Sequence, residues 1–329
     1  MIALVHEVQE VEEVKKEKEI MKMKKFISLL AVTTMVAGMA VGCGNSASSD
    51  SSDAASAKDS AEASADWDSS SDITIVSRED GSGTRGAFIE LFGIEEKDAN
   101  GEKIDNTTED AQITNSTSVM LTTVAGDDYA IGYVSLGSLD DNVKALKIDG
   151  AEATAENIKS GDYKVSRPFN IATKADLDND VAKDFIAFIM SKDGQKVVED
   201  NGYIPVDDAK DFEGTNPEGK AVVGGSSSVS PVMEKLIEAY KTVNPNAEIE
   251  LQTTDSTTGM TSTIDGSYDI GMASRELKDE ESAELTSQVI ATDGIAVIVN
   301  KNNPTDELTA DQVKSIYTGE ALTWDEVAK

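Results

Sequence analysis

The sequence nearly lacks the two residue types that nucleophilic and metal chemistry use most. Its 329 residues include one histidine, His6, and one cysteine, Cys43. A Ser-His-Asp triad, a cysteine nucleophile with a histidine base, and a Cys/His zinc site all need more than these two residues. We therefore expect no catalysis of these kinds, no bound metal ion and no cofactor.

Basic residues are also few. Only 29 lysines and arginines oppose 62 aspartates and glutamates, giving a net charge of −33, and six residues of each sign precede Cys43. The chain from Cys43 onward therefore carries the whole net charge, which excludes a nucleic-acid partner. A protein this acidic can bind an anion only through local donors such as backbone N–H groups and buried arginines.

The first 71 residues are typical of targeting and linker sequence. Residues 1–20 form a Glu/Lys-rich extension that we do not expect in the native protein. Residues 21–42 resemble a bacterial lipoprotein signal, which predicts lipidation of Cys43 and attachment to the outer face of the cell membrane. Conventional secretory cleavage or a short membrane anchor remains an alternative. Residues 43–71, almost all Ser, Ala and Asp, are expected to be a flexible linker.

The most informative segment of the remaining chain is residues 72–88. An alternating strand over 72–77 leads to Arg78, a Gly81-Ser82-Gly83-Thr84 turn follows, and a helix begins there. The glycines allow backbone N–H groups to point at an anion at the helix start. The planar donor group of Arg78 suits a tetrahedral anion, and Asp80 is expected to hold that group in place. The alternative is an ordinary Gly-rich turn with a helix cap.

Strands and helices alternate along the rest of the chain, which favours parallel or mixed sheets with helices on both faces. Further strands are expected over 129–134, 143–148, 167–172, 248–252, 268–273 and 294–300. Helices are expected over 84–92, 181–190 and 309–317. Another helix is expected to start with Ser230 as its cap and Pro231 in its first position.

Three more polar clusters follow strand ends, where α/β sheets place ligands. They are residues 225–228, 255–259 and 273–276. Each cluster alone is as well explained by a helix cap or a solvated loop. Together with the Arg78 turn they provide four donor-rich turns and two arginines, but no acid/base pair. This combination indicates binding rather than turnover, so we expect no enzyme activity.

Several motifs together resemble the phosphate-binding proteins of phosphate ABC importers. Those similar to the N-terminal half of that family lie at 222–231, 269–277, 292–300 and 316–324. Those similar to its C-terminal half lie at 77–85, 130–133 and 166–169. The two halves occur in reversed order, which predicts a circular permutation.

The resemblance implies a two-lobed type II periplasmic-binding-protein fold, α/β with mixed sheets, whose lobes close on one phosphate around a hinge. Residues 72–165 plus 301–329 are expected to form one lobe and residues 166–300 the other. The implied phosphate ligands are Arg78, Ser82, Gly83 and Thr84 from the first lobe, and Ser227, Ser228, Thr257, Ser274 and Arg275 from the second.

The implied function is that of a monomeric, lipid-anchored extracytoplasmic receptor that delivers inorganic phosphate to membrane permease subunits. Alternatives are a receptor for sulfate, molybdate or tungstate, a surface adhesin, or a phosphoesterase with Ser82 as nucleophile. The last lacks both the spacing of a nucleophile elbow and a following histidine. Some family members have an aspartate that accepts the phosphate proton where this chain has Arg275. The acceptor is therefore left open between Asp255, Asp293 and a backbone carbonyl.

Overall fold

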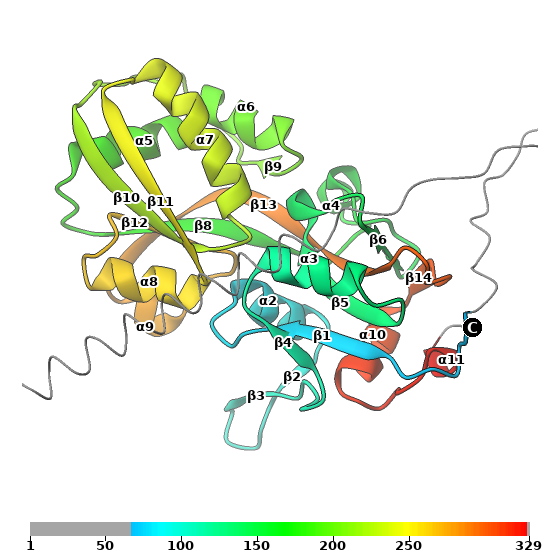
Figure 1. Ribbon diagram of the computed structural model, residues 1–329. Helices are drawn as coiled ribbons and strands as arrows, with labels where there is room; N and C mark the ends of the chain where they lie inside the picture. The colour runs from blue at the N-terminus through cyan, green and yellow to red at the C-terminus, as the bar shows by residue number, and fades with distance from the viewer. Residues whose placement is uncertain (1–66, 328–329) are drawn as a thin grey trace, which may run out of the picture. The chain divides into compact units, whose positions relative to one another are not determined.

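The computed structural model describes residues 67–327 (Figure 1). The expected extension, the signal and its Cys43, and nearly all of the linker lie outside these residues. Within the described part, no helix combines the length and the apolar character that a membrane crossing needs.

Strands and helices alternate, so the predicted α/β class is confirmed. The strands are β1 (Thr74–Arg78), β2 (Glu95–Lys97), β3 (Lys103–Asp105), β4 (Gln112–Thr114), β5 (Ala130–Ser135), β6 (Val143–Ala145), β7 (Lys147–Ile148), β8 (Ser166–Lys174), β9 (Ile204–Pro205), β10 (Gly219–Ser226), β11 (Ala247–Thr254), β12 (Ile270–Ala273), β13 (Leu285–Asn300) and β14 (Glu307–Leu308). The helices are α2 (Gly83–Leu91), α3 (Thr117–Ala125), α4 (Ala155–Ser160), α5 (Asp180–Ile189), α6 (Lys192–Asp200), α7 (Ser230–Val243), α8 (Ser256–Ile264), α9 (Asp279–Ser282), α10 (Ala310–Tyr317) and α11 (Trp324–Val327), with a 3₁₀ turn at Leu136–Ser138.

One mixed sheet runs through the described part in the order β11-β10-β12-β8-β13-β5-β1-β4. At one end β10 is parallel to β11 and β12, and at the other β1 is parallel to β4 and β5. The antiparallel pair β8 and β13 joins the two ends, and both strands run through the middle of Figure 1. Because β13 is 16 residues long, its first part pairs with β8 and its last part with β5.

Buried side chains form two large clusters, which we call core A and core B. Core A contains residues between Ile73 and Val165 together with residues from Ile295 to Val327. Core B contains residues between Phe169 and Ala291. A smaller cluster of four buried residues lies around Met260. The chain therefore passes between core A and core B on β8 and β13.

The C-terminal segment packs beside the start of β1. Trp324 is fully buried in core A, and its indole N–H donates to the Tyr129 carbonyl oxygen at 3.1 Å. The Asp325 N–H donates to the Ser69 carbonyl oxygen at 2.7 Å. Trp67 also stacks on Tyr129, with ring centroids 4.7 Å apart. The two ends of the described chain thus complete one core together.

Three local predictions were wrong. Residues 143–148 do not form one strand, because the chain changes partner at Leu146, pairing first with β13 and then with β14. Strand β13 begins at Leu285, nine residues before its predicted start, because pairing with β8 stabilises a stretch that lacks an apolar alternation. Ser230 does not cap α7: Val229 holds the cap position, and the Ser230 hydroxyl donates to the Ser226 carbonyl oxygen at 3.3 Å.

Candidate anion-binding site

Arg78 ends β1, and its side chain is buried, with 2% exposure. Its backbone N–H donates to the Tyr133 hydroxyl at 3.2 Å, and that hydroxyl lies 2.9 Å from Ser77 Oγ. Burial raises the pKa of Tyr133 to about 12, so the ring keeps its proton at neutral pH. The neutral Tyr133 therefore fixes the end of β1 without adding charge to the site.

The prediction that Asp80 holds the Arg78 guanidinium was wrong, because Glu79 does so. Arg78 Nε and Nη2 each donate to a carboxylate oxygen of Glu79 at 2.8 Å. Asp80 is 96% exposed and pairs instead with Arg85 at 2.7 Å. Arg85 in turn donates to the Arg78 carbonyl oxygen at 2.8 Å. A carboxylate directly next to the arginine thus reaches it more easily than one that lies beyond the start of the turn.

The Gly81-Ser82-Gly83-Thr84 turn starts α2 as predicted. Ser82 is its cap and accepts the Arg85 N–H at 3.3 Å. A β-carbon on Gly83 would lie 2.4 Å from Ser256 Oγ and 2.8 Å from Ser274 Oγ. Only glycine permits this approach, so the first turn of α2 lies directly against residues that follow core-B strands.

Serines of the loop after β10 approach the same turn from core B. Ser228 Oγ lies 2.7 Å from Thr84 Oγ1. The Ser227 hydroxyl accepts from Arg78 Nη2 at 3.2 Å. Ser227, Ser228 and Thr84 are all buried. Hydroxyl donors from both cores are therefore gathered around one buried guanidinium.

The start of α8 and the end of β12 complete this side of the site. Ser274 is fully buried, accepts a hydrogen bond from the Ser226 hydroxyl at 2.9 Å, and donates its N–H to Ser256 Oγ at 3.1 Å. Thr257 donates both its N–H and its hydroxyl to the Gly81 carbonyl oxygen at 3.2 Å. This last contact joins α8 directly to the Gly-rich turn.

Arg275 is already paired. Its Nη1 and Nη2 donate to the two carboxylate oxygens of Glu281 at 2.7 and 2.8 Å, and Nη2 also donates to Thr257 Oγ1 at 3.2 Å. Burial works to raise the pKa of Glu281, but the hydrogen bonds from Arg275 and from the Lys278 N–H, together with the positive charges of both residues, hold that pKa below its usual value. Arg275 therefore lies beside the turn in an ion pair with Glu281.

Sequence reasoning missed two members of this constellation, Glu79 and Thr117. Thr117 starts α3, is buried, and places its hydroxyl 3.2 Å from Ser227 Oγ. Its signal was the run Thr114-Asn115-Ser116-Thr117-Ser118, a polar strand-to-helix turn like the other four. Glu79 had no signal, because adjacent charged residues are common on exposed loops.

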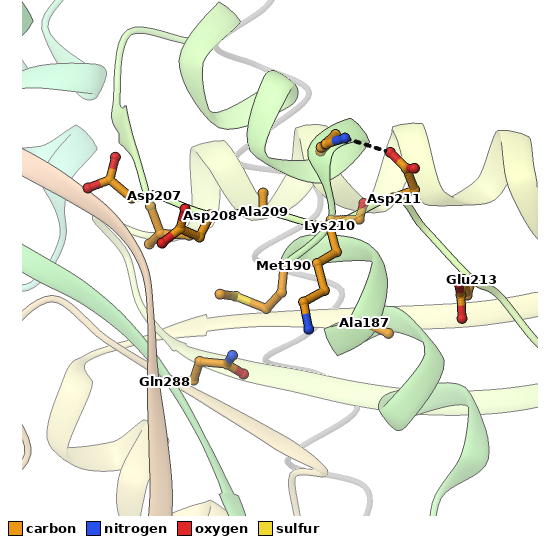
Figure 2. A pocket seen from close by; sticks show the side chains of 12 residues that line it. Ala187, Met190, Asp207, Asp208, Ala209, Lys210, Asp211, Glu213 and Gln288 are labelled. Carbon is orange, nitrogen blue, oxygen red and sulfur yellow. Dashed lines mark ion pairs between the residues drawn. The ribbon is translucent and has the colours of Figure 1, made fainter.

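The described part contains cavities both beside the site and away from it. One of about 960 Å³ opens beside the site and is lined by Ser82, Arg167 and Arg275, among others. The other, of about 820 Å³, lies near α5 and α6 and is drawn in Figure 2. Its charged lining residues are Lys192, Asp207, Asp208, Lys210, Asp211 and Glu213. Four carboxylates against two lysines, one of them paired with Asp211 at 2.9 Å, do not suit an anion.

Two α/β cores that share two crossing strands, with donor-rich helix starts from both cores facing one another, define the class of solute-binding proteins. The arrangement provides hydroxyl groups, helix N-termini and a buried guanidinium, which are the donors that hold a dehydrated oxyanion. Within residues 67–327 it contains no histidine or cysteine that would act as a base or nucleophile.

Comparison with known proteins places the chain in a family. The model of the PBP superfamily domain matches residues 12–193 and 213–329. "Phosphate-binding protein PstS 2" of Streptococcus agalactiae is 60% identical over 262 residues, which cover 79% of this chain and 89% of the relative. This chain belongs to the PBP superfamily, among the phosphate-binding proteins PstS.

Two further relatives give information on the fold and on the order of the two halves along the chain. The crystal structure of a phosphate-binding protein of a Streptococcus pneumoniae TIGR4 phosphate ABC transporter is 45% identical, with a TM-score of 0.62, and the match covers 78% of this chain and all of that one. The Staphylococcus haemolyticus phosphate-binding protein PstS is 42% identical over only 117 residues, 33% of this chain and 37% of the relative. The predicted two-lobed binding-protein fold is confirmed.

Proposed function

We propose that this protein captures inorganic phosphate outside the cytoplasm and delivers it to the membrane permease of an ABC importer. The observation that carries the proposal is the meeting of Arg78 with Ser227 and of Thr84 with Ser228, both across the two cores. A buried guanidinium surrounded by hydroxyl groups and a helix N-terminus offers donors in the number and directions that a tetrahedral oxyanion accepts. The names of the relatives support the same ligand.

The proposed phosphate ligands form two groups. Arg78, with Ser82, Gly83 and Thr84 at the start of α2, provides the charge and the backbone donors, while Ser227, Ser228 and Ser274 provide hydroxyls from core B. Thr257 and Arg275 touch the same turn but are bonded to Gly81 and Glu281. We propose that these two hold the lobes together, and their direct contact with phosphate stays a prediction.

The lobes are proposed to be residues 72–165 plus 301–329 and residues 166–300. The separation of core A from core B supports two lobes, but Ile295 to Val299 are buried in core A, so core packing puts the boundary on β13 near Gly294 rather than after residue 300. We also propose that the gene is a circular permutant, with residues 207–220 joining what are the two termini in the usual order. Two matches support it: the streptococcal one covers 89% of that relative, whereas the staphylococcal one covers only 37% of its relative. An alignment across a permutation covers only one part of each chain.

Membrane attachment is proposed through lipidation of Cys43, with the receptor acting as a monomer on the outer face of the membrane. The experiment is to express the full chain and a Cys43→Ala variant and to follow membrane and medium fractions. The wild-type chain should sediment with membranes and carry a lipid mass on its first residue. Wild-type protein that is released without this lipid would contradict the anchor.

Calorimetric titration tests the ligand. The protein, freed of bound anion by partial unfolding and dialysis, is titrated with phosphate, sulfate, molybdate and tungstate. We expect saturable binding of phosphate at one site and none of sulfate at equal concentration, because a carboxylate or carbonyl that accepts the phosphate proton repels sulfate. Preferential binding of another oxyanion would support the alternative receptor instead.

A chromogenic phosphate ester separates a receptor from an enzyme. A receptor releases no product, whereas a phosphoesterase with Ser82 as nucleophile releases product in proportion to enzyme concentration. Ser82→Ala is the control, because it must abolish any true turnover and leave contaminating activity unchanged.

A further inference from the structure

Arg167 and Asp293 form a buried ion pair where the chain passes between the lobes. They are register partners on β8 and β13, and Arg167 Nη2 lies 3.2 Å from Asp293 Oδ2. Val165 and Ile295 on one side belong to core A, whereas Phe169 and Ala291 on the other belong to core B. The pair therefore occupies the crossing point of the two lobes.

The Arg167 guanidinium has unused hydrogen-bonding capacity. The residue is 3% exposed, yet Nε and Nη1 have no partner within the described residues. Its ring contact, with the guanidinium carbon 5.5 Å from the Phe169 centroid, leaves both nitrogens unbonded. Buried donors of a charged group are almost always satisfied, since each unmet donor carries a desolvation penalty. A purely structural ion pair gives no reason for the two free nitrogens.

Arg167 borders the cavity that opens beside the candidate site. It lines the space of about 960 Å³ together with Ser82 and Arg275. Burial lowers the pKa of Arg167 to about 10, Asp293 counteracts this, and the positive charge of Arg78 lowers it further. The two positive charges therefore repel each other, and an anion between them would reduce this repulsion.

We propose that Arg167 is a second guanidinium ligand of the bound phosphate, and that Asp293 is the positioning residue that holds its guanidinium beside the cavity. This rests on the proposed function of the site. Asp293 holds Nη2 and, through Oδ1, accepts the Gly137 N–H at 3.4 Å, so the carboxylate is itself held by the 3₁₀ turn at Leu136–Ser138. Phosphate binding and closure of the lobes are then coupled at the crossing strands.

The test is calorimetric titration with inorganic phosphate of the wild type and of Arg167→Gln, Asp293→Asn, the double variant and Lys103→Gln. Lys103 is the control, since it lines the same cavity as an exposed cation. Arg167→Gln should raise the Kd by about 30-fold or more, the factor that corresponds to losing one buried charged contact. Lys103→Gln should change the Kd by less than about 3-fold, as for a screened surface charge.

The double variant separates a ligand from a structural role. It replaces the ion pair by two neutral amides, so a purely structural pair predicts that affinity returns to the wild-type value. We expect affinity to stay as low as in Arg167→Gln. Asp293→Asn alone should lose less affinity than Arg167→Gln, because it removes a negative charge near the anion while keeping the donor.

Two further results would overturn the assignment. One is wild-type affinity in Arg167→Gln. The other comes from nitrogen-15 spectra of the wild type, where the Arg167 Nε–H resonance, assigned by its loss in Arg167→Lys, should shift on adding phosphate. An unmoved resonance means that Arg167 does not touch the anion, even if the Gln variant fails to fold. Failure of the wild type itself to bind phosphate would instead contradict the proposed function.

Discussion

Gly83 and Ser256 lie so close that a β-carbon on the glycine would be 2.4 Å from the serine hydroxyl oxygen. The two residues start different helices, α2 and α8, whose buried side chains belong to different clusters. Their approach places both helix N-termini against the same small volume. We therefore predict that the site depends on the approach of α2 to α8 as well as on the donors themselves.

Gly83→Ala should weaken phosphate binding without unfolding the protein. The added methyl group prevents the approach of Ser256, and overpacking of this kind costs about 1–3 kcal/mol. Gly86→Ala is the matched control, because its β-carbon would meet nothing nearer than 3.9 Å and alanine favours the same helix. Titration calorimetry and melting of both variants check this. Equal affinities in the two variants would show that closure does not involve Gly83.

Arg78→Ala should remove most of the affinity for phosphate. The substitution leaves a desolvated anion without its charged partner, which costs on the order of 2–5 kcal/mol of binding. The measurement is the rise in melting temperature on adding phosphate, compared with wild type and with Arg78→Lys. An equal rise in Arg78→Ala would contradict the assignment.

Adding NaCl should weaken wild-type binding only slightly, because short-range buried contacts are little screened.

Stability should depend on pH through Asp293. Burial raises the pKa of its carboxyl to about 6, while the Arg167 charge works in the opposite direction. In the unfolded chain the pKa of an aspartate is about 3.9. Between this pKa and that of the folded chain, the folded chain holds the Asp293 proton and the unfolded chain has lost it. The contribution of Asp293 to stability is therefore complete below about pH 4 and is lost as the pH rises through about 6.

Scanning calorimetry in phosphate-free buffer measures this effect. Between about pH 4 and 6, the window that these two pKa values bound, the melting temperature of the wild type should fall relative to that of Asp293→Asn, which has no carboxyl to titrate. A constant difference between the two proteins across this range would mean that the carboxyl is ionised throughout.

The circular permutation predicts how the chain tolerates rearrangement. Deleting residues 301–329 should prevent folding, because Val313, Ile316, Tyr317 and Trp324 are fully buried in core A. A variant that begins at Lys220, runs through Lys329 into Ser71 and ends at Asp207 should fold and bind phosphate with similar affinity, since the ends of β1 and α11 lie side by side. Circular dichroism and calorimetry compare the two. A stable truncated protein would contradict the permutation.

The sequence determined those features that depend on neighbouring residues. Caps and turns placed α2, α5 and α10 within a residue or two, since Thr309 forms a capping box with Gln312 and Gly319 adopts a positive φ of 75°. The Gly81-Ser82-Gly83-Thr84 turn was found for the same reason. The near absence of histidine and cysteine depends on composition alone, and it predicts that chemistry needing these residues is absent.

Tertiary structure decided whatever depends on partners far apart in the chain. The first half of β13 is a strand because β8 pairs with it. No alternation of apolar and polar residues in that segment predicts the pairing. Glu79 rather than Asp80 holds Arg78, Thr117 joins Ser227, and Arg167 meets Asp293, because distances in space, not spacing in sequence, select these contacts. When a side chain has several possible partners, its actual contact is decided only once the sheet brings one of them within hydrogen-bonding distance.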